Sequence, residues 1–168
     1  MRYLFLLILI ASLSSCWPTR ISFIDGTMPE EWKTFSVKTL ENNAPNTPIS
    51  YAAQLSEKLK DGLQNNTRLL LNPETGKGEV YIEGVISNYS ITPVAIQEGD
   101  NSAKNRLTVS VQFTIFVSAP EEDKIALTTT RFVDYDSNTD LATAESTLLE
   151  EVSTQIVQDV INKLLSNW

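Results

Sequence analysis

The sequence predicts an α+β fold in which a four-stranded, mainly antiparallel sheet carries two helices on one face, in the order β-α-β-β-β-α. Two apolar stripes at helical spacing, one after residue 48 and one over about residues 141–165, predict the helices. Segments with apolar residues at alternate positions predict the strands. Because the other side of these strands is polar, both helices are expected on the apolar side, as a two-layer sandwich. Residues 33–168 are expected to form this single domain.

The first strand and the first helix are expected between residues 34 and 65. Residues 34–40 alternate between apolar and polar side chains, and a loop with two prolines follows at residues 42–48. Thr47 and Pro48 have the residue types of a helix N-cap and a first helical position. The side of the helix that is expected to be buried carries Ala52, Leu55, Leu59 and Leu63.

Three longer strands are expected next, over residues 79–91, 106–118 and 124–135, with residues 68–71 as a candidate start of the first. Short loops join these strands, so they are expected to be antiparallel neighbours. The middle strand has the clearest apolar side, formed by Leu107, Val109, Val111, Phe113, Ile115 and Val117. The polar side of this strand and of the next carries Thr108, Ser110, Gln112, Thr114, Thr128 and Thr130.

The last helix is expected to bury a long stripe against the sheet. Apolar residues recur every three or four positions, while acidic and amide side chains occupy the opposite side. The stripe consists of Leu141, Ala144, Leu148, Val152, Ile156, Val160 and Leu164.

The N-terminus has the organisation of a bacterial lipoprotein signal. Arg2 and an apolar run of about ten residues precede small residues and Cys16, the only cysteine. Such a run is too short to cross a bilayer, which takes about 20 residues. Leu13-Ser14-Ser15-Cys16 resembles a lipobox, so residues 1–15 are expected to be a signal peptide, Cys16 the lipidation site and residues 16–32 a lipidated tether. The alternative is a buried or unpaired cysteine just after an ordinary signal peptide.

Charge and composition exclude several functions. The net charge is −8, and it becomes −9 once residues 1–15 are removed with Arg2, so a nucleic-acid partner is not expected. The chain has no histidine, no Gly-x-Ser-x-Gly motif and no acidic run with the spacing of a calcium loop. We therefore expect no enzymatic activity, no catalytic residue, no metal site and no cofactor.

Several short segments resemble the lipopolysaccharide-assembly lipoprotein (LptE) family in its Bacteroidetes-like form. They are spread over nearly the whole chain after Cys16, in the order expected for that family. The segments are residues 33–37 followed by Glu41-Asn42, residues 66–69, 89–95, 105–109 and 131–137, and the terminal residues 162–168.

The resemblance implies a function without chemistry. Members of this family act at the outer membrane as the plug and assembly partner of a large β-barrel, LptD-like, that inserts lipopolysaccharide into the outer leaflet. Lys104, Arg106 and Arg131 are candidate contacts for its phosphates, although such cations more often pair with nearby carboxylates such as Glu98, Asp100 or Asp134. The alternative function is that of a pilotin or chaperone-like lipoprotein for another outer-membrane barrel or a secretin. Trp17 after the cysteine favours the outer membrane over the inner one.

Overall fold

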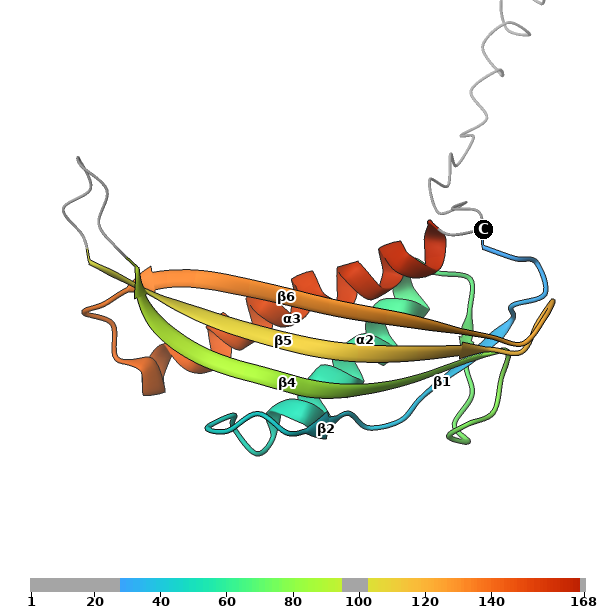
Figure 1. Cartoon of the computed structure of the whole chain (residues 1–168), viewed down its shortest axis with the longest axis horizontal. Coiled ribbons are helices and arrows are strands. Elements are labelled where there is room, and N and C mark those ends of the chain that lie inside the picture. The colour runs from blue at the N-terminus through green and yellow to red at the C-terminus, as the bar shows by residue number, and fades with distance from the viewer. Residues whose placement is uncertain (1–27, 95–102, 167–168) are drawn as a thin grey trace, which may run out of the picture.

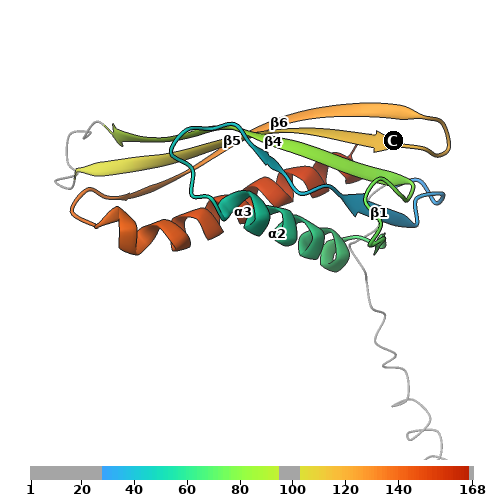
Figure 2. The ribbon, with the colours of Figure 1, turned by 90° about the horizontal axis from the view of Figure 1, so that it is seen from below.

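The structure consists of a sheet layer and a helix layer, as Figure 1 and Figure 2 show. The computed structural model describes residues 28–94 and 103–166. Both helices, α2 (Tyr51–Asn66) and α3 (Leu141–Leu165), lie on the same face of the sheet (Figure 2). The strands are β1 (Thr34–Val37), β2 (Glu41–Asn42), β3 (Leu70–Leu71), β4 (Val80–Val94), β5 (Lys104–Val117) and β6 (Asp123–Asp136). The predicted α+β class is confirmed.

The sheet is mixed and has six strands, which corrects the prediction of four mainly antiparallel strands. Its order is β3-β1-β4-β5-β6, and β2 also pairs with β4. The long strands β4, β5 and β6 are antiparallel, whereas β1 runs parallel to both β3 and β4 and β2 runs parallel to β4. The chain leaves β1 and returns to β4 by way of α2, and a crossover of this kind joins parallel strands. The strands β2 and β3 have two residues each, too few to show an alternating pattern.

The predicted apolar side of β5 is confirmed. All six of its inward side chains are at most 5% exposed, and they lie against the buried stripe of α3. Burying each such side chain contributes about 1.5–3 kcal/mol to folding. The core therefore fills the space between the two layers from Leu107 to Val117 of β5, in agreement with the alternation in the sequence.

The residues just before β1 pack into the same core. Met28 is 6% exposed and Trp32 is fully buried. The indole N–H of Trp32 donates to the carbonyl of Ala119, at the turn between β5 and β6, over 2.5 Å. Arg68 donates to the carbonyl of Met28 over 2.8 Å and also to that of Pro29. The segment from residue 28 to residue 32 is thus fixed to the domain from two sides.

The two helices approach each other closely at Gly62. A Cβ atom at this position would lie 2.4 Å from Cγ1 of Val157 on α3, which is closer than non-bonded carbon atoms approach. The absence of a side chain lets α2 and α3 pack directly on each other. The helix α2 begins at Tyr51 with Ser50 as N-cap, so the predicted start at Thr47 is wrong. The hydroxyl of Thr47 donates instead to the carbonyl of Ala44, over 3.1 Å.

Candidate functional site: the open face of the sheet

One side of the long strands is left without a helix. We call the side of β4, β5 and β6 that points away from α2 and α3 the open face (Figure 2). The register pairs of these strands place their outward side chains in rows across the sheet. This side is the candidate site because, in the described part of the chain, it is a broad surface that the fold leaves accessible.

The middle of the open face is polar and uncharged, as predicted. Its residues are half-buried or exposed, and Ser110 and Thr130 share a hydrogen bond of 2.9 Å between their hydroxyl oxygens. We call this group the hydroxyl band. It consists of Thr108, Ser110, Gln112, Thr114, Thr128 and Thr130. Each of its side chains can both donate and accept a hydrogen bond.

A charged cluster lies at one end of the hydroxyl band. Arg106 donates to both carboxylate oxygens of Asp134, over 2.7 and 2.8 Å. The guanidinium carbon of Arg106 lies 3.8 Å from the ring centroid of Phe132, a cation–π contact. Hydrogen bonding from Arg106 holds the pKa of Asp134 below its usual range, and the charge of Lys104 acts in the same direction. Phe132 is 47% exposed, so the cluster presents an aromatic surface beside the ion pair.

Arg131 lies on the opposite face from Arg106. It is on β6 but points toward α3, where it donates to Asp159 over 2.7 Å through Nε and again through Nη2. Thr129 also donates to Asp159. The hydrogen bonds from Arg131, together with that from Thr129, lower the pKa of Asp159 against the opposing effect of burial. This pair therefore joins the sheet to the helix layer.

The structure brings together two of the three predicted cations. Lys104 and Arg106 are on the open face at the start of β5, whereas Arg131 is separated from them by the sheet. The expected carboxylate partner Asp134 is confirmed for Arg106, while Glu98 and Asp100 lie outside the described residues. For Arg131 the partner is Asp159, which could not be predicted without the position of α3.

An aromatic groove lies at the other end of the hydroxyl band. The rings of Tyr81 and Phe116 stack with centroids 5.8 Å apart, and Nζ of Lys124 lies 5.4 Å from the centroid of Phe116. These residues, with Glu122 and Asp123, line a groove of about 660 Å³. Sequence reasoning missed this groove. The available signal was Phe116, which interrupts the polar side of β5.

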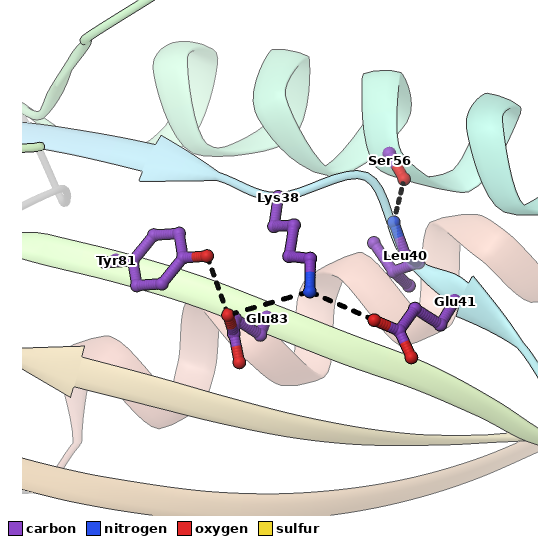
Figure 3. A network of polar contacts seen from close by, with 6 residues as sticks. All are labelled: Lys38, Leu40, Glu41, Ser56, Tyr81 and Glu83. Carbon is purple, nitrogen blue, oxygen red and sulfur yellow. Dashed lines mark hydrogen bonds and ion pairs between the residues drawn. The ribbon is translucent and has the colours of Figure 1, made fainter. Parts of the chain in front are cut away.

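A polar network fixes the border of the open face next to β1 (Figure 3). Nζ of Lys38 lies 3.0 Å from Glu41 and 3.9 Å from Glu83, and it links the segment between β1 and β2 to β4. The hydroxyl of Tyr81 donates to Glu83 over 2.7 Å. Burial, followed by this hydrogen bond, raises the pKa of Tyr81 to about 12. The phenol therefore stays protonated and acts as a donor.

The chain turns into the core between β1 and β2. The backbone N–H of Leu40 donates to the hydroxyl of Ser56 on α2 over 2.9 Å (Figure 3). A Cβ atom on Gly84 would lie 2.8 Å from Cδ1 of Phe113 and 3.3 Å from Cγ of Leu40. Glycine at this position in β4 thus makes room for two side chains in the core.

The described residues hold no group of three or more metal-ligating side chains and no helix long and apolar enough to span a bilayer. Cys16 and the predicted signal peptide lie outside the described residues. The open face of the described residues has hydrogen-bonding groups at its centre and charged or aromatic groups at its ends.

Residues 32–164 match the lipopolysaccharide-assembly (LptE) family. The chain belongs to the LptE family. The match spans more than half of the sequence, and it includes every strand and helix described above, apart from the last residue of α3. The resemblance inferred from short segments is confirmed. As an LptE protein, the chain is a member of a non-enzymatic family of lipoproteins that acts in lipopolysaccharide assembly.

Solved structures share the fold at low sequence identity. The hypothetical protein CT253 from Chlamydia trachomatis is 12% identical with a TM-score of 0.55, over 81% of this chain and 99% of that one. Protein XCC0632 from Xanthomonas campestris is 11% identical with a TM-score of 0.52, over 83% of this chain and 87% of that one. These similarities show the fold alone. Among curated proteins, no sequence matches this LptE protein significantly.

Proposed function

We propose that this LptE protein is an outer-membrane lipoprotein that supports lipopolysaccharide insertion into the outer leaflet as plug and assembly partner of an LptD-like β-barrel. The observation that carries the proposal is the hydroxyl band, a broad uncharged polar surface on the side of the sheet without helices. The interior of large outer-membrane barrels is polar. A surface of hydroxyl and amide groups can exchange its water for hydrogen bonds to such an interior.

The lack of charge in the hydroxyl band favours a protein contact over capture of an anionic ligand. Burying an unpaired charge is far more costly than burying a hydroxyl that finds a hydrogen-bond partner. A net charge of −8 also repels phosphates at long range. In this proposal the band contacts the barrel, and any lipopolysaccharide contact is local.

The proposed lipopolysaccharide contacts remain Lys104, Arg106 and Arg131, and their positions set an order among them. Lys104 and Arg106 share one end of the open face, beside the exposed ring of Phe132. Arg131 already holds Asp159 on the other side of the sheet. A phosphate would therefore meet Lys104 and Arg106 first, in competition with Asp134.

The proposal includes a lipid anchor at Cys16. Membrane attachment becomes stable once two or more acyl chains are inserted. The domain begins in the described structure at Met28, so about a dozen residues would separate the anchor from the domain. Even fully extended, a chain of that length spans at most about 40 Å. The domain would thus stay on the periplasmic side of the outer membrane or within the barrel lumen.

Site-specific photo-crosslinking tests the barrel contact. A photo-reactive amino acid replaces Gln112 in the hydroxyl band of the full chain, and the control carries it at Gln158, which is exposed on α3. We expect crosslinks from position 112 to a barrel of lipopolysaccharide-transporter size, and few from position 158. The proposal is wrong if neither position yields a barrel or if position 158 crosslinks as efficiently as position 112.

Purification of tagged full chain from outer membranes separates the proposal from its alternative. A co-purifying transporter barrel supports the plug role, whereas a secretin or another barrel supports a pilotin-like role. For the anchor, Cys16→Ser should abolish incorporation of labelled palmitate and leave the precursor uncleaved. Continued labelling of this variant would exclude the anchor at Cys16.

A further inference from the structure

The strand β6 forms a long edge of the sheet. It has 14 residues, and within the described part of the chain β5 is the only strand that pairs with it. The opposite edge ends in β3, which has two residues. Natural sheets protect their edges with short strands, prolines, bulges, charged side chains or a covering element. The strand β6 contains no proline, and its register with β5 runs without a shift from end to end.

The even-numbered residues of β6 carry the backbone groups that face this free edge. The N–H of Ser137 donates to the carbonyl of Ala103 over 2.9 Å, and 103 and 137 continue the register between β5 and β6. Backbone groups alternate in direction along an antiparallel strand. Odd-numbered residues of β6 therefore bond to β5, and the even-numbered residues from Lys124 to Asp134 point their N–H and C=O groups outward. The carbonyl of Asp136 already accepts from the N–H of Thr139.

We propose that the edge of β6 pairs with β6 of a second copy of this chain, antiparallel and centred on Thr129. In this register each even residue faces an even residue of the other copy, so the outward backbone groups of both strands meet. Lys124 then lies opposite Asp134, Ala126 opposite Phe132, and Thr128 opposite Thr130.

The side chains of β6 complement themselves in this register. The two pairs of Lys124 with Asp134 bring opposite charges together, and cross-strand pairs of this kind stabilise a sheet. Phe132, which is 47% exposed in the single copy, gains the small Ala126 as its neighbour. On the helix side, Ile125 meets Val133, an apolar pair. Moving the centre by one residue to Thr130 would place Asp134 opposite the uncharged Ala126, and Lys124 opposite Asp136, whose carbonyl already accepts a hydrogen bond from the N–H of Thr139.

The surroundings of the edge leave room for a second strand. A groove of about 490 Å³ runs between the middle of β6 and the C-terminal half of α3. Its lining includes residues 127–131 together with Asp159, Asn162 and Lys163. Arg131, which points toward the helices, is neutralised by Asp159 and so does not repel an approaching strand. The middle of the second β6 would occupy this groove.

The pairing uses the backbone edge and leaves the open face uncovered. Even residues stay on one side of both strands, so the two open faces would form one continuous surface. In this arrangement the edge pairs with a second copy, and the hydroxyl band stays accessible to another partner.

Mixed cysteine crosslinking tests the register. Full chains carrying Thr128→Cys or Thr130→Cys, with different tags, are produced separately and together. We expect a disulfide-linked dimer with both tags from the mixture, and much less from either variant alone. Ser110→Cys mixed with Gln112→Cys is the matched control on the same face, one strand away from the edge. Unchanged chain, with Cys16 only, gives the background.

Three results would overturn the proposal. They are no dimer from the mixture, equal crosslinking from the control mixture, and efficient crosslinking of Thr130→Cys alone, which would place the centre at residue 130.

A second measurement does not depend on cysteines. Ala126→Pro removes an outward N–H without touching the bonds to β5, so the mass of the full chain in detergent, by light scattering, should fall to that of one copy. Ala126→Ser should retain the mass of two, and a single-copy mass for the unchanged chain at all concentrations would exclude the pairing.

Discussion

Each of the two faces of β5 and β6 carries an arginine–aspartate ion pair, and the two pairs differ in their surroundings. On the helix side, Arg131 and Asp159 join two layers, and Asp159 is largely covered by its surroundings. On the open face, Arg106 and Asp134 are neighbours within the sheet, and both remain accessible to solvent. An arginine–aspartate pair between layers stabilises the packing, whereas a pair on one surface is free to meet a ligand. The position of each pair in the fold therefore says more about its role than its chemistry does.

The largest expected effect comes from placing a charge on the helix side. Val109→Asp and Ile156→Asp each bury an unpaired carboxylate at a position that is fully buried. We expect both variants to lose cooperative thermal unfolding by circular dichroism. The matched control is Ser110→Asp, one residue from Val109 on the open face, which should melt close to the unchanged chain. Equal loss of stability in the control would contradict the assignment of the two faces.

The next effect concerns Trp32, which joins the N-terminal segment to the helix side. Trp32→Ala removes a fully buried ring and should lower the free energy of unfolding by about 3–5 kcal/mol. Trp32→Phe retains most of the packing but loses the hydrogen bond to Ala119, so its effect should be smaller. Chemical denaturation measures both. Similar stability of Trp32→Ala and the unchanged chain would show that residues 28–32 do not contribute to the core.

A smaller effect is expected where the helices touch. Gly62→Ala places a methyl group against Val157, and this overpacking should destabilise the protein by about 1–3 kcal/mol. The higher helix propensity of alanine offsets up to about 1 kcal/mol of this loss. Combined with Val157→Ala, the change should cost less than the sum of the two single changes. Additive effects in denaturant unfolding would argue against the close approach.

The smallest expected effect is the loss of thermal stability in acid, where the two ion pairs can be compared. The arginines lower the pKa of Asp159 and of Asp134 in the folded protein. The stability that these ion pairs contribute is therefore fully present above the unfolded carboxyl pKa of about 3.9. It is lost as the pH falls through the lower folded pKa. Below about pH 4 the melting temperature should drop, and Asp159→Asn should reduce this drop.

Asp134→Asn is the control for the acid experiment. It should change the pH dependence less, because exposed ion pairs contribute little to stability. A larger effect from Asp134 than from Asp159 would reverse the comparison of the two faces.

Long elements could be predicted from the sequence and short ones could not. The strand β5 and the helix α3 repeat their pattern many times, so the inward side chains were predictable from spacing alone. The strands β2 and β3 arise because β4 and β1 offer them backbone partners, a property of the assembled sheet. The start of α2 was misplaced because Thr47 and Ser50 are both good N-cap residues and only the loop geometry selects between them.

The candidate site was predictable in its polarity and not in its borders. The hydroxyl band follows from alternation along β5 and β6. The cation–π contact between Arg106 and Phe132 depends on strand register, and the pair between Arg131 and Asp159 depends on the path of α3. The aromatic groove combines residues from β4, β5 and β6 that are far apart in the sequence.

The unequal edges of the sheet set a limit on growth. A sheet with two long free edges can add neighbours at both ends and extend into a fibre. Here β3 offers two residues at one end, and β6 offers 14 at the other. Within the described residues, pairing at β6 would use up the one long edge of each molecule, so association through this edge would stop at two. The asymmetry would allow pairing with a second copy without extension into a fibre.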